Sequence, residues 1–121
     1  MYAFWNDINV FNNEGFIMGQ YHCVYNTDKK EYLHPHRLGD GLKLLEFCES
    51  TTSKALCYLL ANSNGRGGGD IRSNSDYYKG RWAGDRIVIQ GDYAEKDDPA
   101  FIENEDEYGD ISAGVLDEMQ D

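Results

Sequence analysis

Residues 80–93 read GRWAGDRIVIQGDY and contain the one apolar β-branched run of the chain, Ile87-Val88-Ile89. Gly84-Asp85 precedes this run, and Gly91-Asp92 follows it. A short apolar run with turn-forming residues at both ends is typical of a buried strand. The sequence therefore predicts that residues 86–90 form the central strand of a sheet, with this run in the protected interior.

The chain is expected to fold as a single domain. A length of 121 residues suits one domain with one modest core. We assign this domain to residues 21–121, which end in an acidic segment. Residues 1–20 are rich in aromatic side chains and contain a good turn at 12–15, so they are expected to form an N-terminal extension or a loose hairpin.

Two further strands are predicted before the central one. Residues 21–26 alternate in character, and residues 30–34 follow them after a turn at 26–29. A helix is predicted at about residues 52–62, where apolar side chains form a helical stripe after several Ser and Thr residues that can cap it. The order of the strands in the sheet does not follow from these patterns.

The remaining segments complete the predicted fold. Asp110 can cap a short C-terminal helix with apolar residues at every fourth position. Residues 42–47 suit either a buried strand or a helical turn. Residues 94–109 carry few apolar side chains and are expected to form a solvated connection. The predicted fold class is α+β, a small, mainly antiparallel sheet covered by two or three helices.

The net charge of -11 is concentrated near the C-terminal end of the chain. Residues 92–121 carry twelve acidic side chains and one lysine, whereas residues 65–91 carry five basic and three acidic side chains. Such a chain repels the phosphate backbone, so direct binding to nucleic acid is disfavoured. The slightly basic middle segment remains compatible with a small anionic ligand.

Cysteine usage and hydropathy favour a cytoplasmic protein. The chain has three cysteines, an odd number without a framework spacing, as is typical of a reducing compartment. The N-terminus lacks the basic and then apolar pattern of a signal peptide. No apolar run approaches the length of a membrane span, so no membrane partner is expected.

Three longer motifs stand out, GDGLKLLEF at 39–47, NGRGGGD at 64–70 and WAGDRIVIxGDY at 82–93. They resemble motifs of a family of small, uncharacterised cytosolic proteins of bacteria, phages and large viruses. The resemblance covers about residues 21–118 and leaves the aromatic N-terminal segment as an extension. It implies a location in the cytoplasm, that of the host if the source is viral, and it implies no particular activity or cofactor.

The run Asn64 to Asp70 is the most unusual local feature of the chain. Glycines allow successive backbone N–H groups to converge on an anion, as in phosphate-binding loops. The run lacks the Gly-Lys-Ser/Thr ending of a P-loop, so a helix end followed by a flexible connection is the competing interpretation. An anion site here would use Arg66, Gly67, Gly68, Gly69, Asp70, Arg72 and Arg86.

Two histidines form a possible start for a metal site. On an extended backbone His34 and His36 would share one face, where Cys23, Asp40 or Cys48 could add further ligands. No Cys-x-x-Cys or His-x-x-x-His spacing supports this interpretation. A hydrogen-bonded structural role for the histidines is therefore preferred, and no metal or other cofactor is predicted.

The ends of the predicted central strand carry Trp82, Asp85, Arg86, Asp92 and Tyr93. Asp85 and Arg86 are neighbours whose side chains point in opposite directions, so each is expected to pair elsewhere. A buried arginine–carboxylate pair that holds the strand ends is the preferred interpretation. Catalysis by Asp85 or Asp92 is the alternative, although no nucleophile elbow or catalytic triad signature is present.

The acidic end of the chain could present an array of carboxylates to a basic groove on another protein. A solvated, solubilising segment is the competing interpretation, and the spacing of an EF-hand is absent. The array would consist of Glu103, Glu105, Asp106, Glu107 and Asp110.

Three functions follow as hypotheses. The first is an acidic protein-interaction module, such as a viral or phage inhibitor of a host defence or nucleic-acid-binding protein, whose partner has a basic surface. The second is a binder or sponge for a small nucleotide or other anion at the Gly-rich loop. The third is a small hydrolase or metal-dependent enzyme built on His34, His36, Asp85 and Asp92. The uneven charge and the missing catalytic signatures favour the first.

Overall fold

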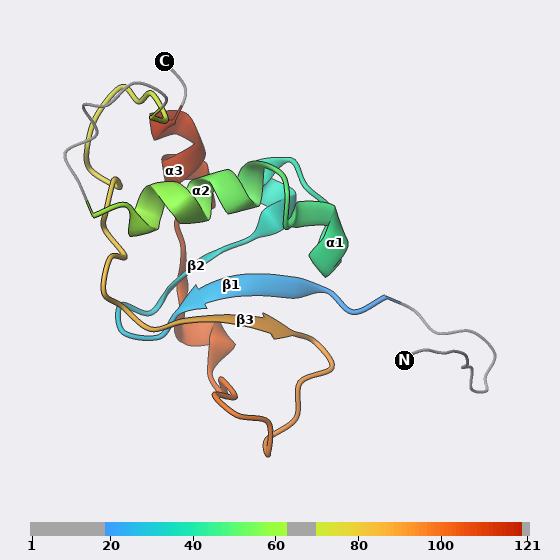
Figure 1. Ribbon diagram of the computed structural model, residues 1–121. Coiled ribbons are helices and arrows are strands. Elements are labelled where there is room, and N and C mark those ends of the chain that lie inside the picture. Colours follow the sequence, from blue (N-terminus) through green and yellow to red (C-terminus); the bar gives the residue numbers. More distant parts are fainter. Residues whose placement is uncertain (1–18, 63–69, 120–121) are drawn as a thin grey trace.

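A computed structural model of the chain describes residues 19–62 and 70–119 (Figure 1). Within these ranges the chain forms a four-stranded sheet with the order β3-β1-β2-β4. The inner strand β1 pairs antiparallel with β2 and β3, and the second inner strand, β2, also pairs with β4, which runs parallel to it. The strands are β1 (His22–Asn26), β2 (Glu31–Leu33), β3 (Ile87–Gly91) and β4 (Gly109–Asp110). The predicted α+β class with a mainly antiparallel sheet is confirmed.

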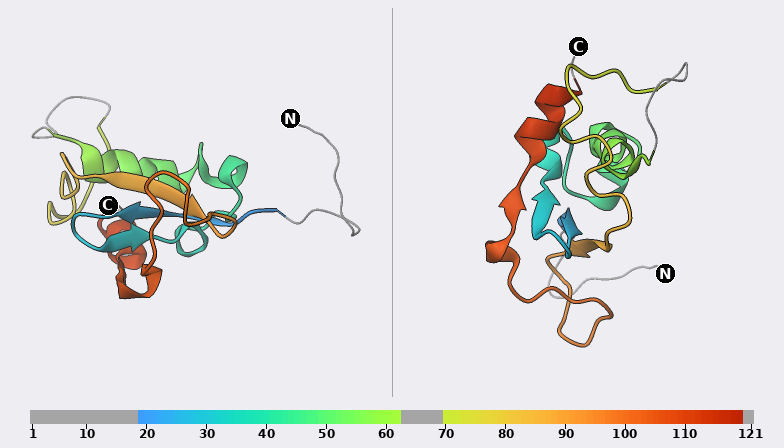
Figure 2. Two further views of the ribbon diagram at one scale, coloured as in Figure 1. Left: turned by 90° about the horizontal axis from the view of Figure 1, so that it is seen from below. Right: turned by 90° about the vertical axis from the view of Figure 1, so that its left-hand side faces the viewer.

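Short helices connect and cover these strands. They are η1 (Pro35–Leu38), α1 (Leu44–Phe47), α2 (Thr51–Leu60), η2 (Glu105–Glu107) and α3 (Ser112–Glu118), of which η1 and η2 are 3₁₀ helices. In the right-hand view of Figure 2, α2 and α3 lie above the sheet, and the segment between β3 and β4 passes below it. The sheet is therefore the middle layer, with helices on one face and an irregular acidic segment on the other.

The core lies between the sheet and α2. Val24 and Leu33 are opposite each other in the β1–β2 register and are both buried on the helical side. They belong to one apolar cluster with Leu59 and Trp82, and Trp82 is 0% exposed. The Trp82 backbone N–H also donates to the Leu59 carbonyl at 2.9 Å, which ties the chain before β3 to the end of α2.

The prediction that Ile87-Val88-Ile89 is the protected central strand is wrong. β3 lies at the edge of the sheet, and the Ile89 side chain is 45% exposed. Ile87 packs against the core cluster, while Val88 is only half-buried. An apolar β-branched run with flanking turns suits an edge strand equally well when one face packs on a core. The large buried side chain of this stretch is Trp82, five residues earlier.

Two helices lie where they are predicted, but their caps differ from the prediction. α2 occupies the predicted region, and its N-terminus is capped by Asp40 rather than by the adjacent Ser and Thr residues. One oxygen of the Asp40 carboxylate accepts the Thr52 backbone N–H at 2.8 Å and the Thr52 hydroxyl at 2.6 Å. For α3, the N-cap residue is Ile111 and not the predicted Asp110, which lies one position earlier and accepts the backbone N–H of Ser112 at 2.9 Å.

The alternatives left open for residues 42–47 are resolved as a single helical turn, α1. Phe47 is buried in the core, whereas Leu45 is 87% exposed, so one face of this turn carries the packing. Pro35 occupies the first turn of η1, as its fixed φ favours. The aromatic residues 1–18 lie outside the described residues.

Candidate functional site

The second face of the sheet carries Tyr25 and Gln90 and is covered by the acidic segment, residues 92–110. The Gln90 side-chain amide pairs with the backbone of Ile102 through two hydrogen bonds. Gln90 Nε2 donates to the Ile102 carbonyl at 3.0 Å, and the Ile102 N–H donates to Gln90 Oε1 at 2.8 Å. Both residues are buried. Residues 94–109 are mostly exposed, as expected of a solvated connection, but Ile102 is buried, and a glutamine from β3 attaches the segment to the sheet at this residue.

A second attachment joins Glu105 to the same face. Tyr25 Oη donates to one carboxylate oxygen of Glu105, and Gln90 Nε2 donates to the other at 2.8 Å. The Tyr25 ring stacks on Tyr32 with centroids 5.5 Å apart and meets the Tyr108 ring edge-on at 5.4 Å. Burial and the bond to Glu105 raise the pKa of Tyr25, so its hydroxyl remains protonated and donating. Glu105 is thus a structural carboxylate turned towards the sheet.

The predicted carboxylate array divides into two groups. The Glu105 carboxylate accepts bonds from Tyr25 and Gln90, and Asp110 pairs with Arg37 at 3.0 Å and also accepts the Ser112 N–H at the start of α3. The other members, Glu103, Asp106 and Glu107, are exposed on the acidic segment. We call these three residues the acidic face. Glu105 and Asp110 are exposed residues as well, but their carboxylates already have partners within the fold, so the acidic face is the part of the array that we expect a partner to contact.

Gln90→Leu is expected to release the acidic segment and to lower the free energy of unfolding by about 2 kcal/mol. The substitution leaves the buried N–H and carbonyl of Ile102 without partners, which is the costly way to lose hydrogen bonds. Amide hydrogen exchange at Ile102 should accelerate. Tyr25→Phe, which removes only the bond to Glu105, serves as control and should change that exchange rate less. Equal effects of the two substitutions would contradict the role of Gln90.

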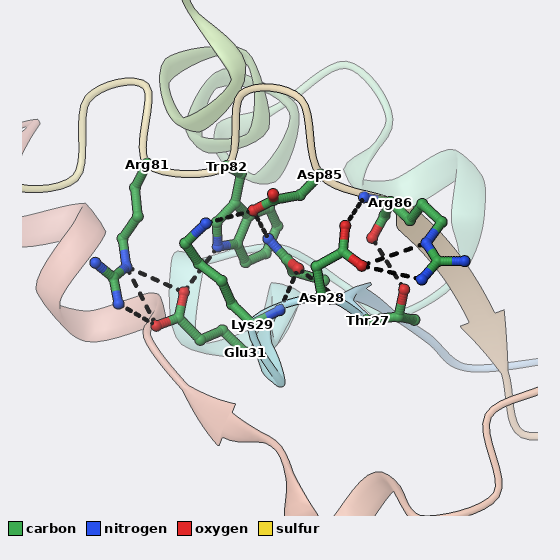
Figure 3. A network of polar contacts seen from close by, with 9 residues as sticks. Thr27, Asp28, Lys29, Glu31, Arg81, Trp82, Asp85 and Arg86 are labelled. Carbon is green, nitrogen blue, oxygen red and sulfur yellow. Dashed lines mark hydrogen bonds and ion pairs between the residues drawn. The ribbon is translucent and has the colours of Figure 1, made fainter.

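A network of hydrogen bonds and ion pairs joins the turn between β1 and β2 to the residues just before β3 (Figure 3). Asp85 accepts bonds from Lys29 Nζ at 2.7 Å and from Asn26 Nδ2 at 2.8 Å. Arg86 pairs with Asp28, 3.2 Å from guanidinium to carboxylate. The two neighbours thus pair with separate residues, as predicted. The bonds from Lys29 and Asn26 hold the pKa of Asp85 below its usual value, so it is a charged structural group.

The buried arginine–carboxylate pair of this network uses different residues from those predicted. The Glu31 carboxylate of β2 accepts hydrogen bonds from two nitrogens of Arg81, at 2.6 and 3.1 Å. It also accepts a bond from the indole Nε1–H of Trp82 at 2.9 Å. Its side chain is 14% exposed. Burial would raise the pKa of the Glu31 carboxyl, but the bonds from Arg81 and Trp82 outweigh it and keep the pKa low. This pair anchors the tryptophan and not the strand ends.

The hydrolase and metal hypotheses find no assembled site in the part of the chain that the structure describes. Asp85 and Asp92 lie at opposite ends of β3, and Asp92 accepts the Tyr21 backbone N–H at 3.0 Å. His34 and His36 have ring centroids 6.4 Å apart. No group of three His, Cys, Asp or Glu residues among residues 19–62 and 70–119 is placed to hold a metal ion.

A small cavity of about 200 Å³ lies beside Cys23, between His22 and His34. The Nδ1 atoms of both histidines are buried and have no hydrogen-bond partner within the described residues. Burial raises the pKa of the Cys23 thiol to about 11. The thiol therefore stays protonated at neutral pH and is a poor nucleophile.

The predicted anion site lies largely outside the described residues, which omit Arg66, Gly67, Gly68 and Gly69. Of its described members, Asp70 and Arg72 are exposed. The loop after them is hydrogen-bonded to α3, where the Asn74 N–H donates to the Glu118 carbonyl at 3.0 Å. Arg86 instead forms an ion pair with Asp28 of the β1–β2 turn. The described members of the predicted site thus attach to different elements.

Arg86 does line a groove of about 450 Å³ that sequence reasoning missed. Its other lining residues come from the β1–β2 turn, from β3 and from the acidic segment, and include Lys30, Val88, Phe101 and Tyr108. Lys30 Nζ lies 5.3 Å from the centre of the Tyr108 ring. No local sequence pattern joins these residues, because they meet only when the acidic segment folds under the sheet.

None of the helices within the described ranges has the length and apolar character needed to cross a bilayer. The resemblance to a family of bacteria, phages and large viruses remains a prediction. Comparison of the chain with models of protein families, with curated proteins and with solved structures finds no match.

Proposed function

We propose that this protein is an acidic protein-interaction module whose acidic face binds a basic surface on a partner protein. The observation that carries the proposal is the attachment of the acidic segment to the sheet by Gln90, through Ile102 and Glu105. Because this segment is fixed, its outward carboxylates keep one arrangement before a partner arrives. Preorganisation of this kind reduces the entropy that binding costs.

The charge of the segment supports the same function. Residues 92–110 carry nine acidic side chains and a single lysine, Lys96. A dense field of one sign steers a partner of opposite sign and raises the association rate. A basic groove that normally holds nucleic acid is the most complementary target, so we propose inhibition of a host nucleic-acid-binding or defence protein in the cytoplasm. The resemblance to a family of bacteria, phages and large viruses is compatible with this more specific form.

The test compares two triple variants with equal net charge. Glu103→Gln, Asp106→Asn and Glu107→Gln together neutralise the acidic face, whereas Glu49→Gln, Asp70→Asn and Asp76→Asn neutralise three exposed carboxylates elsewhere. Binding of a labelled Lys/Arg-rich peptide of about 15 residues is measured by fluorescence anisotropy. With up to about 1 kcal/mol for each exposed ion pair, the acidic-face variant should bind about tenfold more weakly.

Salt dependence provides the second measurement. The wild-type protein should lose affinity for the peptide steeply as ionic strength rises, because exposed charges are screened beyond about 8 Å at 0.15 M salt. The control variant should retain most of the wild-type affinity. Equal weakening in both variants would mean that net charge alone attracts the peptide, and this outcome would overturn a defined acidic face.

A further inference from the structure

The groove beneath the β1–β2 turn combines two cations with an apolar floor. Lys30 and Arg86 line it together with Val88, Phe101 and Ile102. Its volume of about 450 Å³ falls in the range of small-ligand pockets, which run from about 300 to 1,000 Å³. Such pockets are mainly apolar with a few polar groups that fix orientation.

Backbone strain is concentrated at this groove. In the part of the chain that the structure describes, the non-glycine residues with positive φ are Lys30, at 60°, and Ala100, at 63°. Both line the groove. The Lys30 conformation is held by two backbone bonds, from its N–H to Asn26 and from the Gly109 N–H to its carbonyl, each 2.9 Å. A left-handed conformation costs about 1–2 kcal/mol for a residue with a side chain, and residues held in such conformations cluster at functional sites.

The two cations retain capacity for an anion. The Arg86 side chain is 84% exposed, and its pair with Asp28 uses Nε and Nη2. Figure 3 shows its other terminal nitrogen turned away from Asp28 with no bond among the residues drawn. Lys30 is an exposed ammonium group held near the Tyr108 ring. A phosphate in the groove would receive a charge-assisted bond from each of these side chains that it reaches.

The remaining lining residues define the other end of a ligand. Phe101 offers aromatic surface on which a flat ring can stack, and Glu103 offers an acceptor for ring N–H or hydroxyl groups. The Tyr108 ring already contacts the Lys30 ammonium group. We infer that the groove binds a nucleoside monophosphate, with its phosphate at Lys30 and Arg86 and its ring on Phe101. This site shares Arg86 with the predicted anion site, and its other lining residues were not part of that prediction.

The net charge of the protein works against any anion, so the local cations have to outweigh it. At physiological ionic strength exposed charges further than about 8 Å from the groove are largely screened. Within the groove, Glu103 is the opposing carboxylate, and a ligand with donors at its far end converts this repulsion into a hydrogen bond. A bare phosphate lacks such donors, and a nucleoside lacks the anion.

Three classes of probe test the inference with the full chain. Isothermal titration measures binding of the four common nucleoside 5′-monophosphates, of the matching nucleosides and of ribose 5-phosphate. At least one monophosphate should bind with a Kd below about 1 mM and at least about tenfold more tightly than either of its parts. Failure of every monophosphate to bind, or equal binding of ribose 5-phosphate, would overturn the inference.

Matched variants connect binding to the groove. Lys30→Gln and Arg86→Gln should each raise the Kd of the monophosphate about tenfold, since each removes one charge-assisted contact. Lys54→Gln removes the same charge from an exposed position on α2 and should leave the Kd unchanged. If all three variants weaken binding equally, the ligand responds to overall charge and the groove assignment fails.

A further variant separates binding from folding. Lys30→Gly relieves the left-handed backbone, so the thermal midpoint should stay constant or rise by up to about 4 °C. Binding of the monophosphate should nevertheless fall about tenfold, because the ammonium group is lost. Asp106→Asn with Glu107→Gln should leave the Kd unchanged, which keeps this result independent of the acidic face. Retained binding in Lys30→Gly would show that the lysine has no role in the groove.

Discussion

Trp82→Ala is expected to lower the free energy of unfolding by about 4 kcal/mol, the largest effect of any single substitution considered for this chain. Trp82 is 0% exposed and is the largest fully buried side chain within the described ranges. Its ring fills the core between α2 and the sheet, and its indole N–H satisfies Glu31. The variant loses this packing and leaves a buried carboxylate with one donor fewer. Urea denaturation, monitored by circular dichroism, measures the change in the free energy of unfolding.

Ile89→Ala is the matched control from the β-branched run. Ile89 is 45% exposed at the edge of the sheet, so its truncation should cost less than about 1 kcal/mol. Trp82→Phe should lower the free energy of unfolding by more than Ile89→Ala and by less than Trp82→Ala. It keeps most of the apolar volume of the ring but removes the bond to Glu31. A larger loss for Ile89→Ala than for Trp82→Ala would contradict the position of β3 at the sheet edge.

Glu118→Ala is expected to lower the free energy of unfolding by about 3 kcal/mol. Glu118 is 4% exposed and accepts bonds from Tyr58 Oη at 2.5 Å, from Ser75 Oγ at 2.7 Å and from the Tyr78 N–H at 2.8 Å. Removal of the carboxylate leaves several buried donors without an acceptor, which is far more costly than loss of a surface bond. The substitution also releases residues 74–78 from α3. Chemical denaturation measures the loss, and limited proteolysis should show earlier cleavage within these residues.

The pH dependence of the free energy of unfolding tests the contribution of the Glu118 charge. Burial would raise the pKa of the Glu118 carboxyl, but the bonds from Tyr58, Ser75 and backbone N–H groups outweigh it and lower the pKa below 4.5. A carboxyl with a lowered folded-state pKa stabilises the fold above its unfolded pKa, and this stabilisation is lost as the pH falls through the folded value.

Glu118→Gln should therefore differ most from the wild type near pH 6. The difference in unfolding free energy should shrink as the pH falls below about 4.5. Asp40 and Glu31 also have lowered pKa values, so the wild type should keep part of its acid sensitivity in the variant. A constant difference between pH 6 and pH 3 would show that the charge of Glu118 contributes nothing.

Local sequence patterns determined most of the secondary structure. Alternation around the turn at 26–29 predicts β1 and β2, the β-branched run predicts β3, and the apolar stripe predicts α2. Each of these signals records burial of one side of an element, and burial of one side is a property that a dozen neighbouring residues can encode. The α+β class follows from the same patterns.

Strand order, by contrast, was decided by the tertiary structure. Nothing local distinguishes an edge strand with one packed face from a central strand, so β3 was misplaced. The fourth strand, β4, is two residues long and has no apolar signal at all. It exists because the Gly109 N–H bonds to the Lys30 carbonyl and the Ile111 N–H bonds to the Tyr32 carbonyl.

The candidate sites show the same division. The sequence determined that the C-terminal end of the chain is acidic and that residues 92–110 carry most of its charge. Only the tertiary structure decided that Glu105 turns inward to Tyr25, that Gln90 fixes Ile102, and that Lys30 and Arg86 share a groove with the acidic segment. These contacts join side chains 12 to 80 positions apart through hydrogen bonds and shape, and such pairings leave no periodic trace in a sequence.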